Sequence, residues 1–239
     1  MNLKNQRIVV LGGTSGIGLA VAKAAVGEGA TVVVGSSSQA RVDAALAVLG
    51  KTAEGRAVDL ADPAATRAFF EWTGPFDHLV YTAGDSIQLL GLDADLADMR
   101  RFFELRYWGA LGAAQSARAS IRPGGSMVFT SGSASARPLG PGWAAASSIC
   151  GAMEGLTRAL AVELKPLRVN CVAPGVVRTP LWSGMSEADR EALYAAEAAR
   201  LPVGHAGEPE EIAQAYLYLM RQTYVTGQVV NVEGGGLLA

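Results

Sequence analysis

The sequence predicts a single α/β domain built on a doubly wound parallel sheet of about seven strands, with helices on both faces. Short apolar runs rich in β-branched residues alternate with helical segments along all 239 residues. The apolar runs are continuous, which is typical of strands that a parallel sheet buries on both faces. Alternation over this length favours helices that cross back between neighbouring parallel strands. No linker or internal repeat divides the chain, so we expect one domain over residues 1–239.

The individual elements follow from local patterns. We expect strands over residues 7–11, 30–34, 56–59, 78–81, 127–130, 168–172 and 229–232. Asp62 precedes Pro63, which combines an N-cap residue with proline at the first helical position, and Glu208 before Pro209 is similar. Two long helices, around 96–120 and 144–164, have apolar residues at the spacing of an amphipathic helix. These residues are Leu96, Met99, Phe103, Tyr107 and Ala110 in the first, and Ile149, Met153, Leu156, Leu160 and Leu164 in the second.

Composition and charge exclude several functions. The net charge is −2, and no basic run is longer than Arg100-Arg101, which disfavours nucleic acid or a membrane surface as a partner. No apolar stretch approaches the ~20 residues that a membrane span needs. The N-terminal residues lead directly into the first strand without a signal peptide, and we expect a cytoplasmic protein. Cys150 and Cys171 fit no metal-ligand spacing, so we expect free thiols and no metal.

A glycine-rich turn follows the first strand. It reads Gly12-Gly13-Thr14-Ser15-Gly16-Ile17-Gly18 and leads into a helix that should begin near Ile17. Glycine lets the chain turn tightly and approach a pyrophosphate, whose charge then faces the helix N-terminus. A phosphate-binding P-loop is excluded because no Gly-Lys-Ser/Thr follows. The alternative is a tight strand–helix turn without a ligand, but the motifs below favour a dinucleotide site and a Rossmann-type fold.

The residues after the second expected strand bear on the choice of dinucleotide. An NAD site places an acidic residue there to bind the ribose hydroxyls and repel a 2′-phosphate. This chain instead has Gly35-Ser36-Ser37-Ser38 and then Arg41. Hydroxyls and a guanidinium favour NADP(H) over NAD(H) as the cofactor. Alternatively, the serines only begin a helix and Arg41 is solvated.

The glycine turn, the segment Pro174-Gly175-Val176-Val177-Arg178-Thr179 and a late Glu-Gly-Gly together resemble the short-chain dehydrogenase/reductase family. The resemblance covers essentially the whole chain. It implies that Asp59-Leu60 contacts the adenine, that Ala83-Gly84 follows a close-approach turn, and that residues 174–179 lie beside the nicotinamide. The expected cofactor-binding residues are then Gly12, Thr14, Ser15, Gly16, Ile17, Gly18, Ser36, Ser37, Ser38, Asp59, Leu60, Ala83, Gly84, Pro174, Gly175, Val177 and Thr179.

The same resemblance implies four catalytic positions. In this family a tyrosine is the general acid/base, a lysine lowers its pKa and holds the ribose, a serine orients the carbonyl, and an asparagine supports a proton relay. The serine corresponds to Ser133, but the asparagine corresponds to Arg106, the tyrosine to Ala146 and the lysine to Cys150. No tyrosine of the chain is followed four residues later by lysine. The chain is thus identified as an atypical member with a degenerate active site.

Each catalytic position has a functional and a structural interpretation. Arg106 is a permanent cation, able to polarise a carbonyl or bind an anionic substrate, or else to pair with Glu104 or another acid as a structural cross-link. Ser133 orients a substrate oxygen, or belongs with Ser131 and Ser135 to a plain polar loop. Ala146 and Cys150 lie one turn apart on a helix and favour small-residue packing over a reactive thiol, because no nearby His or Lys lowers the thiol pKa.

Two functions remain open, and so does turnover itself. The first is an NAD(P)-dependent oxidoreductase of atypical mechanism, acting on a small carbonyl, alcohol or activated alkene, with Ser133 and Arg106 at the substrate. Tyr81, Tyr107 or water are candidate proton donors. The second is a catalytically silent NAD(P)-binding protein, either a redox sensor or an inactive partner subunit.

Two further expectations concern the substrate side and assembly. Residues 181–206 should form a lid, with Trp143, Trp182, Met185 and Tyr194 as an apolar, aromatic lining, or else as residues that pack the lid or an interface. The family resemblance implies a homotetramer or dimer formed through the two long helices and the C-terminal segment, and it leaves a mixed oligomer open.

Overall fold

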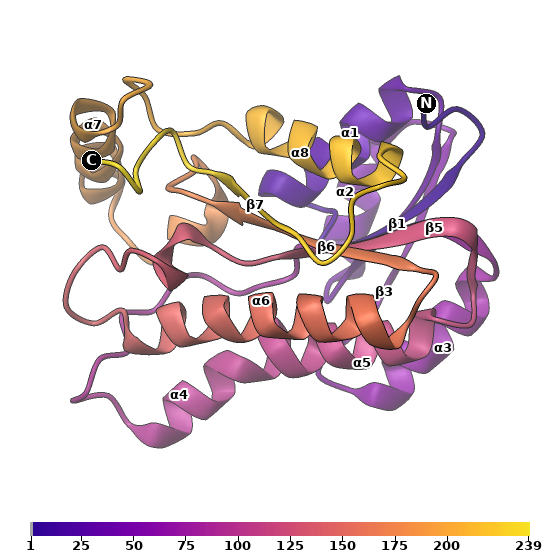
Figure 1. Cartoon of the computed structure of the whole chain (residues 1–239), viewed down its shortest axis with the longest axis horizontal. Coiled ribbons are helices and arrows are strands. Elements are labelled where there is room, and N and C mark those ends of the chain that lie inside the picture. The colour runs from indigo at the N-terminus through magenta and orange to yellow at the C-terminus, as the bar shows by residue number, and fades with distance from the viewer. Residues whose placement is uncertain (1) are drawn as a thin grey trace.

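A computed structural model describes residues 2–239 as three layers, with a seven-stranded sheet between two layers of helices (Figure 1). Every strand pairing is parallel, in the order β3-β2-β1-β4-β5-β6-β7. This confirms the predicted doubly wound sheet. The strands are β1 (Arg7–Leu11), β2 (Thr31–Ser36), β3 (Ala53–Ala57), β4 (Phe76–Tyr81), β5 (Ile121–Thr130), β6 (Arg168–Pro174) and β7 (Val229–Val232).

The helices divide between the two faces of the sheet. They are α1 (Gly16–Gly27), α2 (Gln39–Leu49), α3 (Pro63–Thr73), α4 (Leu96–Phe103), α5 (Gly109–Ala117), α6 (Ala144–Glu163), α7 (Glu187–Arg200) and α8 (Pro209–Arg221). Successive side chains of a strand point to opposite faces. Ile8 and Val10 accordingly pack with residues of α1, α2 and α8, whereas Val9 and Leu11 pack with residues of α3, α5 and α6. Both faces are therefore covered, as the continuous apolar strands predict.

The observed bounds of the edge strand β3 differ from the predicted ones. Sequence pattern placed it at 56–59, but the structure forms it at Ala53–Ala57. Its residues are half-buried or exposed, so the apolar run that marks a central strand is absent there. The predicted helix starts at Pro63 and Pro209 are confirmed: the Asp62 side chain accepts from the Ala64 amide at 2.8 Å, and Glu208 forms a capping box with Glu211.

The first long helix is interrupted by one π-helical turn, η1 (Glu104–Trp108), between α4 and α5. In η1 the Gly109 amide donates to the carbonyl of Glu104, five residues back, so the Leu105 carbonyl loses its usual helical partner. The Tyr81 hydroxyl, at the end of β4, donates to that carbonyl at 2.5 Å. A Cβ at residue 109 would lie 2.6 Å from the Tyr81 hydroxyl oxygen, so the turn requires glycine there. The π turn is thus built by a tertiary contact.

Residues 181–206 leave the sheet and include the end of the short 3₁₀ turn η3 (Pro180–Trp182) and the helix α7. Trp182 and Tyr194 are buried in this excursion together with Val176 and Ala206. Within residues 2–239 no helix is long and apolar enough to cross a membrane, and no cluster of three His, Cys, Asp or Glu side chains is arranged to hold a metal.

Candidate active site

A cavity of about 610 Å³ opens at the carboxyl ends of the central strands. The loops that follow β1, β2, β4, β5 and β6 all contribute to its walls, which is where open α/β sheets place their ligand sites. All of the predicted cofactor-binding residues line it except Ser38. The prediction for Ser38 was wrong, because this hydroxyl caps α2 by accepting from the Arg41 amide.

The glycine turn forms one end of the cavity. Gly12 has a φ of +84°, in the left-handed region that favours glycine, and its amide donates to the Gly35 carbonyl at 2.9 Å. A Cβ at Gly18 would lie 2.2 Å from the Gly12 carbonyl oxygen, so helix and loop are in the closest contact backbone allows. The first turn of α1 has no acidic residue, and the Ser15 side chain accepts no capping hydrogen bond. The amide end of α1 is therefore free to face an anion.

Ser36, Ser37 and Arg41 form the wall beyond the glycine turn. The Arg41 guanidinium donates to the Ser37 hydroxyl at 2.7 Å, and the Thr14 hydroxyl donates to Ser36 at 3.2 Å. No carboxylate stands at the end of β2, as the sequence indicated. Cation and hydroxyls together match the geometry and charge of a phosphate monoester. The residues present thus fit an anionic group of a dinucleotide.

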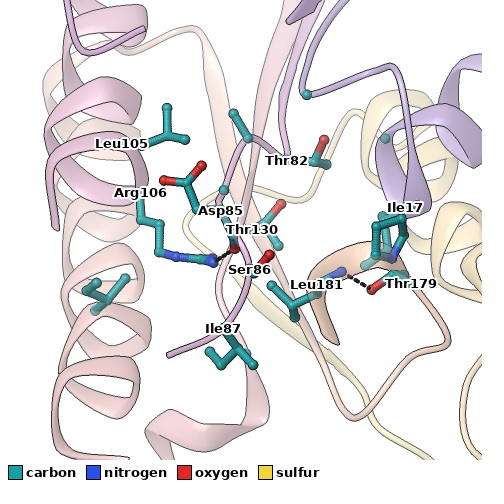
Figure 2. Close-up of a pocket in the computed structure, with 18 of the residues that line it drawn as sticks. Ile17, Thr82, Asp85, Ser86, Ile87, Leu105, Arg106, Thr130, Thr179 and Leu181 are labelled. Atoms are coloured by element: carbon teal, nitrogen blue, oxygen red, sulfur yellow. Dashed lines mark hydrogen bonds between the residues drawn. The ribbon is translucent and has the colours of Figure 1, made fainter. Parts of the chain in front are cut away.

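Arg106 points from η1 into the opposite side of the cavity, across from Ile17 and Thr179 (Figure 2). Its Nη2 donates to the backbone carbonyl of Asp85, and its guanidinium lies over the Phe102 ring with Cζ 4.7 Å from the ring centroid. Within residues 2–239 it makes no ion pair with Glu104 or with another acid, so the cross-link that the alternative interpretation expected is not formed. Burial lowers the pKa of Arg106, while the nearby carboxylate of Asp85 raises it.

Tyr81 also lines the cavity, but its hydroxyl is committed to the Leu105 carbonyl. Burial raises the pKa of Tyr81 well above its ordinary value, and the charge of Arg106 only partly offsets this. Tyr107 lies outside the cavity wall, with its ring edge-on to Trp108. Neither tyrosine is therefore placed as the replacement proton donor that the sequence left open.

Three serines on and after the end of β5 differ in what their hydroxyls do. Ser131 donates to the Cys150 carbonyl at 3.0 Å, and Ser135 donates to the Glu154 carboxylate. Ser133 begins the 3₁₀ turn η2 (Ser133–Ser135) and lines the cavity. Its hydroxyl makes no hydrogen bond to any residue within 2–239, so of the three only this one remains available to a ligand.

Ala146 and Cys150 lie one turn apart on α6 and both face the cavity. Ala146 is buried and packs in the core with Ile149 and Met153, as the small-residue interpretation expects. Burial raises the pKa of the Cys150 thiol to about 11, against a smaller lowering by its contacts with Ser131 and Arg106. A thiol of that pKa is protonated near neutrality and is a poor nucleophile.

The substrate side of the cavity is closed by residues 85–87 and 181–183. The Ile87 amide donates to the Leu181 carbonyl at 2.8 Å, and the Ser86 and Ser183 hydroxyls lie 2.8 Å apart. Trp143 and Trp182 line the cavity as predicted, with ring centroids 6.4 Å apart. Of the segment 181–206 only residues 181–183 border the cavity, and a lid over it stays a prediction.

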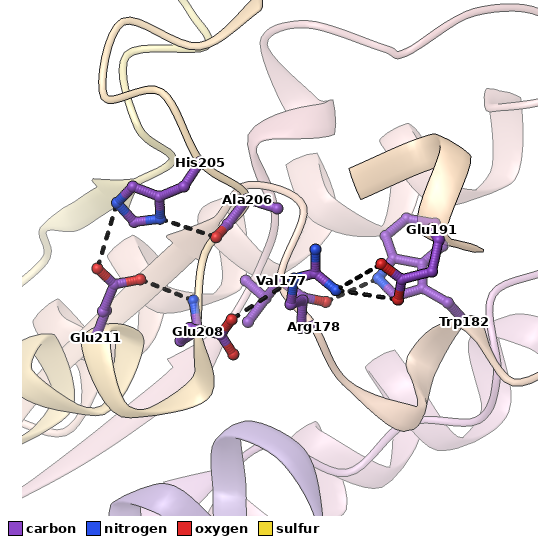
Figure 3. Close-up of polar contacts among 8 residues, drawn as sticks. All are labelled: Val177, Arg178, Trp182, Glu191, His205, Ala206, Glu208 and Glu211. Carbon is purple, nitrogen blue, oxygen red and sulfur yellow. Dashed lines mark hydrogen bonds and ion pairs between the residues drawn. The ribbon is translucent and has the colours of Figure 1, made fainter. Parts of the chain in front are cut away.

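Met185 and Tyr194 do not line this side, and the alternative that they pack the lid applies to both. Tyr194 packs under the Arg178 guanidinium, whose Cζ lies 4.3 Å from the ring centroid, and Met185 packs against the same cluster. Arg178 also pairs with Glu191 at 3.1 Å and Glu208 at 3.6 Å (Figure 3). These ion pairs connect α7 to the start of α8. Met185 and Tyr194 therefore contribute to the packing of residues 181–206 and not to the cavity wall.

Sequence reasoning missed several wall residues. Asp85, Ser86 and Ile87 follow the predicted Ala83-Gly84, and Phe102 comes from α4. Continuing the loop by three residues would have found the first group. Phe102 carries no local signal, because only the packing of α4 against the sheet brings it to the cavity.

Comparison with known proteins agrees with this geometry. A family model described as enoyl-(acyl carrier protein) reductase matches residues 12–236. A short-chain dehydrogenase/reductase of Stachybotrys chlorohalonatus is 36% identical, with 99% of this chain and 98% of the relative covered. The structure of a reductase/Diels-Alderase from Malbranchea aurantiaca is 30% identical with a TM-score of 0.92, and 99% of this chain and 98% of that one are covered.

A crystal structure of a small-chain dehydrogenase in complex with NADPH is also similar. It is 34% identical with a TM-score of 0.86, covering 99% of this chain and all of that one. These matches span nearly the full length of each protein, and they agree with the predicted motifs. The chain belongs to the short-chain dehydrogenase/reductase family of oxidoreductases.

Proposed function

We propose that the chain is an NADP(H)-dependent oxidoreductase of atypical mechanism, whose substrate is a small activated alkene or carbonyl compound. The proposal rests on a contrast between the two sets of residues that line the cavity, those that fit the cofactor and those at the family's catalytic positions. The backbone features that fit a dinucleotide are intact, whereas the positions of the family's tyrosine and lysine are Ala146 and Cys150. The NADPH complex of a similar dehydrogenase supports a nicotinamide cofactor.

The cofactor is held by elements at one side of the cavity. The amide end of α1 and the glycine turn face the pyrophosphate, while Ser37 and Arg41 bind a 2′-phosphate. Gly84 leaves room for the Arg106 guanidinium, since a Cβ there would lie 2.6 Å from Nη1 of Arg106. When bound, the dinucleotide supplies or accepts a hydride.

The chain's own residues act on the substrate oxygen. The free Ser133 hydroxyl donates a hydrogen bond to it, and the Arg106 guanidinium stabilises negative charge that develops there. Arg106 does not release a proton near neutrality, so the proton comes from water. The lost general acid is worth about 10²–10⁴-fold, whereas positioning of the reactants contributes ~7–11 kcal/mol, so reaction is slowed and not abolished.

This balance favours one class of substrate. A conjugated enone or enal takes a hydride at carbon and leaves its charge spread onto an oxygen, which a fixed cation stabilises without immediate proton transfer. A simple ketone becomes an alkoxide, whose charge is more concentrated and needs the missing acid. We therefore expect activated alkenes to be better substrates than ketones. The segment 181–206 would act as the lid over them.

Two measurements test the proposal. Titration of NADPH and NADH against tryptophan fluorescence should show binding of both, with NADPH tighter. Bound NADPH should then be oxidised stoichiometrically by 2-cyclohexenone and far more slowly by cyclohexanone, and Ser133→Ala should slow the first reaction. Binding without oxidation by enones, ketones or quinones favours the silent NAD(P)-binding alternative. If neither dinucleotide binds, both functions are wrong.

A further inference from the structure

The side of the cavity opposite the glycine turn contains a cation with no carboxylate partner. Nη2 of Arg106 donates to the Asp85 carbonyl, and this is the one hydrogen bond the guanidinium makes within residues 2–239. Nε is buried and has no hydrogen-bond partner in the same range. The side chain of Asp85 is near enough to raise the pKa of Arg106 but forms no ion pair with it within 4.0 Å. A donor that is buried without a partner is unusual and calls for an occupant.

Arg106 differs in this from the other arginines of the cavity wall. Arg41 and Arg101 are exposed, and each has a local partner, Ser37 and Asp98 respectively. Burial removes water from the Arg106 guanidinium and lowers its pKa. An anion in the cavity would therefore replace the stabilisation of the positive charge that water provides in the unfolded chain. The Phe102 ring beneath the guanidinium offers only a weak substitute for an anion.

The surroundings of Arg106 define the rest of the ligand. Besides the carboxylates of Asp85 and Glu104, the cavity wall is lined by apolar side chains that include Phe102, Ile149 and Met153, and the free hydroxyl of Ser133 belongs to the same cavity. Trp143 and Trp182 close the substrate side. A ligand that fits has one anionic group and an apolar body. Pockets of this kind fix orientation through a few polar groups.

We propose that Arg106 binds the carboxylate of the substrate, so that the substrate class is a small unsaturated or oxo carboxylic acid with an apolar body. The carboxylate would adjoin the reacting double bond or oxo group, so that the same guanidinium also stabilises the charge that develops there. The guanidinium is planar and presents its donors in a fork that matches a carboxylate. The phosphates of the dinucleotide are already provided for at the glycine turn and Arg41. Ile17 of the glycine turn lies across the cavity from Arg106 (Figure 2). This inference rests on the proposed function and narrows it.

Binding to the full chain tests the inference without turnover. The probes are trans-cinnamate and its neutral isostere cinnamamide, measured by calorimetry with and without saturating NADP⁺. Wild type should bind cinnamate at least 10-fold more tightly than cinnamamide, across pH 6–9 and less so at high salt. Arg106→Gln should reduce this preference to within about twofold, and Arg106→Lys should keep part of it, since the charge remains but the fork is lost.

Arg100→Gln is the matched control, because Arg100 is exposed on α4 and lies outside the cavity wall. It should retain the full preference. Circular dichroism and the midpoint of urea unfolding establish that each variant is folded. An unchanged preference in Arg106→Gln, or none in wild type, overturns the inference. So does a loss of NADPH affinity of more than 10-fold in Arg106→Gln with the carboxylate preference intact, since Arg106 would then be a cofactor contact.

The two proposals fail separately. If wild type prefers cinnamate through Arg106 but binds neither NADPH nor NADH, the carboxylate site stands and the proposed function is wrong. If the dinucleotide binds and enones are reduced but no carboxylate preference exists, the proposed function stands and the substrate class is wrong.

Discussion

Arg41→Gln should weaken NADPH binding selectively. In the structure the Arg41 guanidinium is exposed and 2.7 Å from the Ser37 hydroxyl, in the place where a 2′-phosphate is expected. A hydrogen bond to a charged group contributes about 1.5–3 kcal/mol, and solvent screening reduces that at an exposed site to about 1–1.5 kcal/mol. At about 1.4 kcal/mol for each factor of ten, the Kd for NADPH should rise roughly 5- to 12-fold.

The assay is quenching of tryptophan fluorescence by each dinucleotide. NADH lacks the 2′-phosphate, so its Kd should stay within about twofold of the wild-type value. Arg67→Gln is the matched control, because Arg67 is exposed on α3 and lies outside the cavity wall. It removes the same charge and should leave both affinities unchanged. Equal weakening of NADPH and NADH in Arg41→Gln, or no change in either, would refute the placement of the phosphate.

Three further perturbations have outcomes fixed by the structure. Gly18→Ala places a Cβ 2.2 Å from the Gly12 carbonyl oxygen, so fluorescence titration should show the affinities for NADPH and NADH reduced at least ~10-fold. Gly27→Ala is the control and should bind both normally, because its Cβ meets nothing within 4 Å. Tyr81→Phe leaves the Leu105 carbonyl without its hydroxyl partner and should cost about 1–3 kcal/mol in urea unfolding; an unchanged midpoint would contradict the account of the π turn. Burial, aided by the charge of Arg168, lowers the pKa of His78 from 6.5 to about 4, so the folded state favours the neutral imidazole. The contribution of His78 to the free energy of unfolding is complete above pH 6.5 and should fall by about 2 kcal/mol at pH 5. His78→Asn should remove this loss.

The fold was predictable from sequence because its signals are local. Continuous β-branched runs such as 168–172 mark strands buried on both faces, and proline after a capping residue fixed two helix starts. The edge strand β3 was displaced since its exposed residues need no apolar run. The cofactor side of the cavity was predictable for the same reason, because the glycine turn and the N-terminus of α1 follow one another directly in the chain.

The substrate side was not predictable, because it depends on contacts between distant segments. A pattern of apolar residues from Leu96 to Ala110 predicts one helix, but the π turn requires Tyr81 to reach Leu105 across the fold. Arg106 lies in this π turn and lines the cavity, whereas the sequence left open whether it faces the pocket. In the same way, Tyr194 is aromatic and close in sequence to residues of the cavity wall. Its ring nevertheless packs against the Arg178 guanidinium and not against the cavity.

The proposed function requires that this family member binds the cofactor but has lost ordinary proton transfer. The most direct measurement is the rate of NADPH oxidation by a simple ketone in wild type and in the double variant Ala146→Tyr with Cys150→Lys. Both side chains project into the cavity from α6, so the new tyrosine and lysine should face the substrate. Wild type should bind NADPH with ketone reduction near background, and the double variant should be faster by about 10²-fold or more. Fast ketone reduction by wild type, or no gain in a folded variant that binds NADPH, would contradict the claim.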